Sequence, residues 1–94
     1  MNKYDVLFIL DNDLSDEQKA GLVDKFSSLI VSLGGAVSET DVWGTRKYAY
    51  PINFKNQGYY VKIVFEADPS VPQEVNRIMR ITDGVVRNMI RRLA

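Results

Sequence analysis

The sequence contains no cysteine and no histidine among its 94 residues. Without cysteine there is no disulfide framework and no thiolate metal site. Without histidine the chain lacks the commonest metal ligand and the commonest general base. It also has no apolar run near the roughly 20 residues that a membrane-spanning helix needs, and its first residues lack a signal-peptide pattern. We therefore expect a cytoplasmic protein that does not contact a membrane.

Recognised catalytic motifs are missing as well. The sequence has no phosphate-binding glycine motif, no Ser/His/Asp or Cys/His set and no metal-ligand spacing. The acidic segment 11–17 (DNDLSDE) loosely resembles a calcium loop, but it lacks the required glycine and the final glutamate at the right distance. It is more typical of a loop followed by a helix cap. We predict a non-enzymatic protein with no catalytic residue, no metal, no cofactor and no small-molecule substrate.

The sequence does contain enough apolar material for one core. Hydrophobic residues make up 46% of the chain and aromatic residues 11%, as in globular proteins. At this length we expect a single domain over residues 1–94. The net charge is zero, but residues 1–45 hold three basic and eight acidic side chains, whereas residues 46–94 hold nine basic and four acidic ones. This asymmetry suggests one face for an anionic partner, although the halves of a sequence need not become the faces of a fold.

Hydrophobic periodicity predicts the order of the secondary-structure elements. Ser15 and Gln18 have the spacing of a capping box at the start of a helix, and residues 34–35 (GG) are typical of its end. Pro72 suits the first turn of a second helix. The expected elements are a strand at 3–10, a helix from 15, strands at 36–53 and 58–67, a helix opened by 68–73 and a strand at 85–93, with a bulge or bend at Trp43-Gly44.

This β-α-β-β-α-β order predicts an α+β, ferredoxin-like split βαβ fold. Such a fold is a four-stranded antiparallel sheet with both helices on one face, and its first and third strands are central. The two-residue period of a strand assigns alternate side chains to the core. Those assigned are Tyr4, Val6, Phe8, Leu10, Tyr59, Val61, Ile63 and Phe65, with Tyr48, Tyr50 and Ile52 from the second strand.

No helix covers the opposite face of this sheet, so that face should be polar. It is nevertheless predicted to carry apolar side chains beside a lysine, namely Leu7, Ile9, Tyr60, Val64 and Lys62. At about 25 cal/mol per Å², burying a few hundred Å² of this face would contribute several kcal/mol before the costs of association. A protein surface and exposed bases both suit such a face, and single exposed apolar residues also occur without function. We take these five as candidate partner-binding residues.

Cations concentrate in the last helix and the last strand. All of them are arginine, whose guanidinium offers two parallel hydrogen bonds to phosphate and stacks on planar groups. They are Arg77, Arg80, Arg87, Arg91 and Arg92. Arg46 and Lys47 follow the predicted bend and lie in a protruding hairpin. We take these seven as candidate RNA-binding residues; the alternative is a solvated face with internal ion pairs.

Five blocks of the sequence carry a resemblance over essentially the whole chain. They are KYDVLFIL (3–10), GG (34–35), WGTRKYAYPI (43–52), QGYYVKIVF (57–65) and RIMRITDGVVRNMI (77–90). In their order and spacing they resemble the family of bacterial small-subunit ribosomal protein six. The resemblance implies the ferredoxin-like fold, binding to the central domain of small-subunit ribosomal RNA, and pairing with small-subunit ribosomal protein eighteen. It also implies that Arg46, Lys47, Tyr50, Arg80, Arg87 and Arg91 fall in blocks associated with RNA and partner surfaces, and we add Trp43 and Tyr50 to the partner-binding candidates.

The resulting hypothesis is a structural protein of the small ribosomal subunit that binds RNA together with another protein. Because the net charge is zero, much of the RNA affinity should come from the heterodimer. One alternative is a small-molecule-binding or acylphosphatase-like domain on the same fold. That chemistry needs an arginine in the loop after the first strand, where this chain has the acidic segment 11–15 (DNDLS). A further alternative is a homo-oligomeric module that pairs through its sheet.

Overall fold

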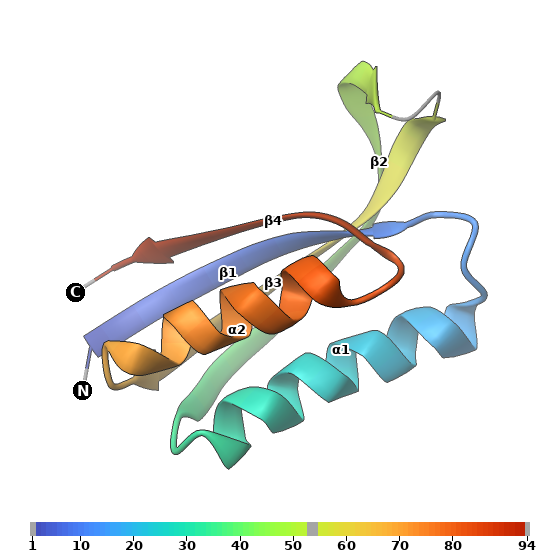
Figure 1. Ribbon diagram of the computed structural model, residues 1–94. Helices are drawn as coiled ribbons and strands as arrows, with labels where there is room; N and C mark the ends of the chain where they lie inside the picture. The colour runs from blue at the N-terminus through green and yellow to red at the C-terminus, as the bar shows by residue number, and fades with distance from the viewer. Residues whose placement is uncertain (1, 53–54, 94) are drawn as a thin grey trace.

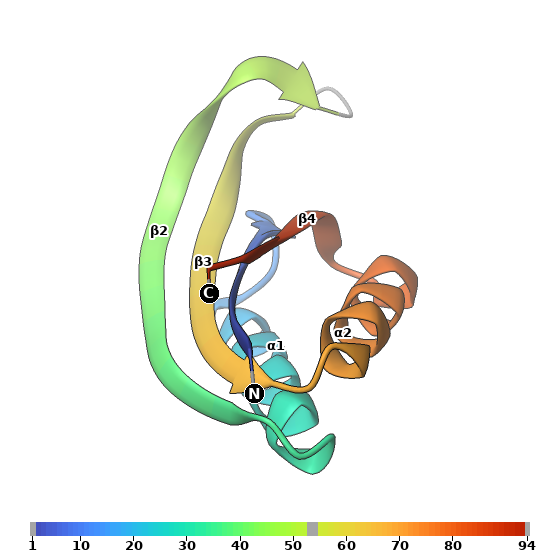
Figure 2. The same cartoon turned by 90° about the vertical axis from the view of Figure 1, so that its left-hand side faces the viewer.

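The computed structural model describes residues 2–52 and 55–93, and within these the side chains of 2–47 and 57–93 (Figure 1). Its elements are β1 (Asn2–Asp11), α1 (Asp16–Ser32), β2 (Ala36–Ile52), β3 (Lys55–Ala67), α2 (Ser70–Ile81) and β4 (Val85–Arg92). The strands form one antiparallel sheet in the order β2-β3-β1-β4. Both helices lie on one side of it (Figure 2). The predicted ferredoxin-like fold is confirmed, with the first and third strands in the centre.

The predicted capping box begins α1. The Ser15 hydroxyl accepts a hydrogen bond from the Gln18 backbone N–H at 3.1 Å, and the Gln18 side chain accepts one from the Ser15 N–H at 3.0 Å. At the other end Gly34 adopts a positive φ of 91°, which an L side chain rarely adopts. The Gly35 N–H then donates to the Ile30 carbonyl at 2.9 Å. These contacts place the chain at the start of β2.

The core fills the space between the sheet and the two helices. The core assignments made from the strand period are buried in β1 and β3, with Tyr59 partly buried. Phe26 and Ile30 of α1, and Val75 and Met79 of α2, pack against them and are fully buried. Leu33, which continues the apolar spacing of α1, caps the helix end instead and is 37% exposed. The alternation of the strands therefore describes the core better than the spacing of the first helix does.

The hairpin of β2 and β3 projects beyond the rest of the sheet (Figure 1). Its base contains the predicted bend, because the register of β2 on β3 shifts between Val42 and Gly44, and Gly44 has a φ of 81°. β3 begins at Lys55, earlier than the sequence pattern indicated. The core assignments of Tyr48, Tyr50 and Ile52 lie outside the residues whose side chains are described.

Neither helix within residues 2–52 and 55–93 is long and apolar enough to cross a membrane.

Candidate functional site

Three rows of residues cross all four strands on the sheet face away from the helices. The strand registers define the rows, because residues paired across neighbouring strands point to the same face. Listed from β4 to β2, and starting at the hairpin, they are Arg87, Ile9, Tyr60 and Gly44; then Met89, Leu7, Lys62 and Asp41; then Arg91, Asp5, Val64 and Glu39. We call this surface the open face. It unites the candidates Leu7, Ile9, Tyr60, Val64 and Lys62 as predicted, and it adds Arg87 and Arg91 to them.

An aromatic pair forms the hairpin end of the open face. The rings of Trp43 and Tyr60 stack with centroids 6.3 Å apart and planes inclined by 7°. The indole N–H of Trp43 donates to a carboxylate oxygen of Asp41 at 2.9 Å, which fixes the ring on this face. Trp43 remains 39% exposed. The bulge before Gly44 therefore turns Trp43, a partner-binding candidate that the sequence did not assign to a face, onto the open face.

The apolar part of the open face is only partly accessible. Met89 is 56% exposed, whereas Ile9 and Val64 are each only 7% exposed although no helix covers them. Leu7 between them is half-buried. The side chains of neighbouring rows thus cover much of the apolar surface that the sequence pattern assigned to this face. Met89 faces outward here, while Asn88 faces the helices and donates to Asn76 of α2.

An ion pair closes the far end of the open face. Arg91 donates to both carboxylate oxygens of Asp5, from Nε at 3.1 Å and from a terminal nitrogen at 2.7 Å. The Asp5 side chain is buried, whereas the Arg91 side chain is 63% exposed. The hydrogen bond from Arg91 lowers the pKa of Asp5 below its ordinary value, against the opposing effect of burial. The Asp5 carboxylate therefore orients Arg91, and the exposed remainder of the guanidinium can still donate to a partner.

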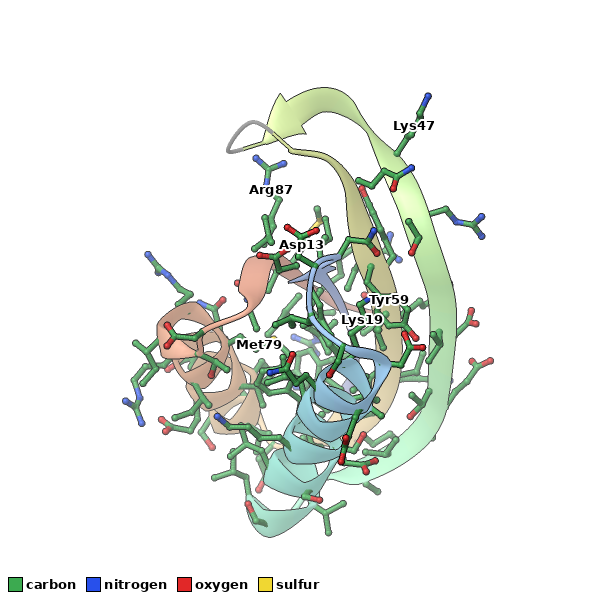
Figure 3. All side chains as sticks on the ribbon, turned by 90° about the vertical axis from the view of Figure 1, so that its right-hand side faces the viewer. Asp13, Lys19, Lys47, Tyr59, Met79 and Arg87 are labelled. Atoms are coloured by element: carbon green, nitrogen blue, oxygen red, sulfur yellow. The ribbon has the colours of Figure 1, made fainter. Side chains whose placement is uncertain are left out.

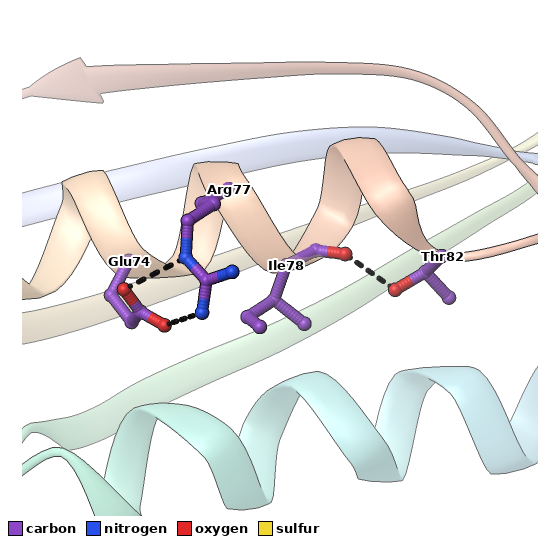
Figure 4. A network of polar contacts seen from close by, with 4 residues as sticks. All are labelled: Glu74, Arg77, Ile78 and Thr82. Carbon is purple, nitrogen blue, oxygen red and sulfur yellow. Dashed lines mark hydrogen bonds and ion pairs between the residues drawn. The ribbon is translucent and has the colours of Figure 1, made fainter.

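The arginines of α2 and β4 do not share one surface. Arg77 forms an ion pair with Glu74 one turn earlier on α2 (Figure 4), and this pair lowers the pKa of the Glu74 carboxylate. Arg92 donates to the Asn2 side chain at 3.3 Å. Arg80 and Arg87 flank a groove of about 280 Å³ between α2 and β4. The rest of its lining is Met79, Val85, Val86 and Asn88.

The remaining cationic candidates lie on the hairpin. Arg46 pairs with Gly58 and Lys47 with Gln57, three and four positions beyond the bulged Trp43. Both side chains are exposed, and Lys47 points away from the body of the molecule (Figure 3). Tyr50 lies outside the residues whose side chains are described. The hairpin cations and Arg87 thus occupy the same end of the sheet.

Sequence reasoning missed two charged residues that the fold buries. The two-residue period of β1 assigns Asp5 to the open face, but the sequence does not indicate its burial or its partner 86 residues away. Lys19 lies three residues before Leu22 and seven before Phe26, on the apolar stripe of α1, and is 7% exposed. That spacing was the signal available for Lys19. Within the described part of the chain, no group of three or more acidic side chains is placed to hold a metal ion.

These observations define a class, a ferredoxin-like binding domain with an open sheet face and a cationic end. The comparisons define the family. The family model of Ribosomal protein S6 matches residues 3–92. The chain is 46% identical over 90 residues to the small ribosomal subunit protein bS6 of Caldanaerobacter subterraneus subsp. tengcongensis and 48% identical to that of Clostridium novyi. Each alignment covers 96% of this chain and 95% of the relative.

A solved structure agrees with these relatives. The crystal structure of 30S ribosomal protein S6 from Thermotoga maritima superposes with a TM-score of 0.93 at 28% identity, and the match covers 98% of this chain and 87% of that one. The chain therefore belongs to the Ribosomal protein S6 family, and with it to the non-enzymatic structural proteins of the small ribosomal subunit. The acylphosphatase-like alternative is set aside by this membership.

Proposed function

We propose that the chain binds the central domain of small-subunit ribosomal RNA together with small-subunit ribosomal protein eighteen. The observation that carries this proposal is the position of Arg87. It ends a row of the open face and also flanks the groove beside Arg80. A protein seated on the open face and an RNA strand seated in the groove would meet at this residue.

The open face suits the protein partner better than it suits RNA. Its centre, around Leu7 and Met89, is apolar, and its sides carry both cationic and acidic groups. Protein interfaces have an apolar centre and a polar rim of mixed charge. The stacked Trp43 and Tyr60 provide the kind of aromatic anchor that carries much of the binding energy in such interfaces. Arg91, held by Asp5, adds a positioned donor at the opposite rim.

The groove and the hairpin suit the RNA backbone. Arg80 and Arg87 approach the groove from two different elements, so both can contact one phosphate or two successive ones. Arg46 and Lys47 extend the cationic surface at the same end of the sheet. Arg77 is the least available of the candidates, because Glu74 already occupies its guanidinium. Arg92 lies at the other end of β4, beside Asn2.

The net charge of the chain predicts how much each protein of the heterodimer contributes to RNA affinity. The chain has 12 basic and 12 acidic residues, so long-range attraction to RNA is weak. We expect weak and salt-sensitive RNA binding by the chain alone and tight binding by the heterodimer. The test is a gel-shift titration against a central-domain RNA fragment, with and without small-subunit ribosomal protein eighteen. Tight, salt-insensitive binding by this chain alone would contradict the proposal.

Arg80→Ala and Arg77→Ala form a matched pair for the RNA surface. Both remove one positive charge from α2, but only Arg80 lines the groove. In the heterodimer, Arg80→Ala should weaken RNA binding several-fold and lower the salt slope by about 1. Arg77→Ala should change affinity by less than about twofold. Equal losses in the two variants would indicate that RNA contacts the whole exposed side of α2 and not the groove in particular.

A further inference from the structure

A small polar cluster lies where the hairpin leaves the sheet. It consists of Asn12, Lys19, Thr45 and Tyr59, and we call it the hairpin-base cluster. The Lys19 ammonium donates to the Asn12 side-chain oxygen at 3.4 Å and lies over the Tyr59 ring, 4.8 Å from its centroid. The Thr45 hydroxyl donates to the same Asn12 oxygen at 2.8 Å. The cluster therefore connects α1, the turn after β1 and both strands of the hairpin.

Lys19 is an unusual residue for this position. A lysine is seldom buried, because removing its ammonium from water is costly unless polar or aromatic groups replace the water. Lys19 is only 7% exposed, and here an amide oxygen and the face of an aromatic ring replace part of that water. Lys19 and Tyr59 lie side by side (Figure 3). A methionine or leucine would fill the same place on the apolar stripe at lower cost, so the charge serves something other than packing.

The cluster stands directly before the cationic part of the hairpin. Thr45 pairs with Tyr59 in register, and the next two pairs are Arg46 with Gly58 and Lys47 with Gln57. Gly44, with its bulge, lies on the other side of Thr45. A two-stranded ribbon beyond a bulge can bend and twist more freely than the sheet it leaves. The contacts to α1 and to the β1–α1 turn restrain it on the helix side.

We propose that Lys19 is a positioning residue, which fixes the direction of the hairpin and so presents Arg46 and Lys47 to RNA at a set place relative to Arg87. This inference rests on the proposed function, because it assumes that the hairpin cations contact RNA. Lys19 itself lies too deep to reach a phosphate. Lys19 raises RNA affinity by keeping the hairpin ordered before binding, because a mobile hairpin loses conformational entropy when it binds.

Lys19→Met and Lys25→Met are the matched test. Both remove one positive charge from α1 and keep an aliphatic stem. Lys25 is exposed and donates to Thr82, which follows α2, at 3.5 Å, so it is not part of the hairpin-base cluster. With small-subunit ribosomal protein eighteen and a central-domain RNA fragment, Lys19→Met should lose about three- to tenfold in affinity and Lys25→Met less than about twofold. Equal losses of affinity in the two variants would show that only the net charge matters, and would overturn the inference.

A double-mutant cycle separates positioning from other roles of Lys19. The Lys19→Met substitution is repeated in a chain carrying Arg46→Ala and Lys47→Ala. If Lys19 acts through these two cations, its effect on affinity disappears in that background. An effect of unchanged size would show that Lys19 acts elsewhere and would overturn the inference.

Hydrogen exchange tests the hairpin independently of RNA. In Lys19→Met, the amides of residues 45–47 and 57–59 should exchange about tenfold faster, while the core amides of β1 keep their rates. Unchanged exchange at the hairpin base would overturn the positioning role. If the background with Arg46→Ala and Lys47→Ala itself binds RNA normally, the proposed contact of the hairpin with RNA is wrong, and exchange alone then decides whether Lys19 positions the hairpin.

Discussion

Two adjacent glycines end α1 for different physical reasons, and alanine substitutions should separate them. A Cβ on Gly35 would lie 2.8 Å from the Ile30 Cγ2 atom, 3.0 Å from the Ile30 carbonyl oxygen and 3.2 Å from the Glu66 carbonyl oxygen. The two oxygens belong to the last turn of α1 and to the central strand β3, so they cannot withdraw without disturbing backbone hydrogen bonds. A Cβ on Gly34 would meet nothing within 4 Å, but Gly34 has a φ of 91°.

The expected loss of stability follows from these distances. Steric crowding in a packed site costs about 2–3 kcal/mol, and the stiffer unfolded chain of an alanine variant returns about 0.5–1 kcal/mol. Gly35→Ala should therefore lose about 2 kcal/mol, or roughly 10 °C in melting temperature for a domain of this size. Gly34→Ala carries only left-handed backbone strain of about 1–2 kcal/mol, offset in the same way. Its net loss should be at most about 1.5 kcal/mol, and smaller than that of Gly35→Ala.

Urea and thermal unfolding followed by circular dichroism measure both losses. The parent and both variants should unfold in one transition with similar denaturant slopes, so that the midpoints report stability alone. If Gly35→Ala is no less stable than Gly34→Ala, the steric account of Gly35 is wrong. A changed slope in Gly35→Ala alone would mean that its folded state has rearranged around the new methyl group.

Three further predictions concern single residues. Gly21 is an exposed position of α1 with nothing within 4 Å of an added Cβ, so Gly21→Ala should raise stability by about 0.5–1 kcal/mol in the same unfolding assay, and an unchanged midpoint would contradict this. Ser15→Ala removes the capping box and should cost about 1 kcal/mol, whereas Ser15→Asp should restore most of it; equal midpoints for the two variants would argue against the cap. Arg91 lowers the pKa of Asp5, so the Asp5 carboxylate stabilises the fold above its unfolded pKa of about 3.9 and this contribution is lost as the pH falls through the lower folded value. Asp5→Asn should therefore melt a few degrees below the parent at pH 7, and the gap should narrow below about pH 4; a gap that stays constant to pH 3 would refute the role of the charge.

The sequence predicted those features that repeat along the chain. Alternation in β1 and β3 identified the core because a strand buries every second residue whatever it pairs with. The capping box of α1 and the bend at Trp43-Gly44 were predicted because they depend on neighbouring residues. The sequence did not decide which side chains of the last strand face the helices. A shift of one residue exchanges the two faces of the strand, and only the pairing with β1 decides between them.

What the sequence did not predict depends on residues that the fold brings together. Asp5 and Arg91 are 86 residues apart, and neither residue type announces a partner. The five arginines of the last helix and strand were treated as one cluster, whereas the fold divides them among the open face, the groove, an ion pair within α2 and a contact with Asn2. Lys19 was not singled out from the sequence, although its place on the apolar stripe of α1 was a signal of burial.

The central position of β1 has a consequence for folding during synthesis. β1 is made first, pairs with β3 along one edge and with β4 along the other, and the Lys3 carbonyl also accepts the Leu93 N–H. Until residues 85–92 leave the ribosome, one edge of β1 has no strand to pair with, although both helices can already cover its apolar face. The nascent chain therefore passes through a stage with an unpaired strand edge, which invites pairing with other chains. Completion of β4 ends that stage, and with Arg91 it also delivers the arginine that pairs with the buried Asp5 carboxylate.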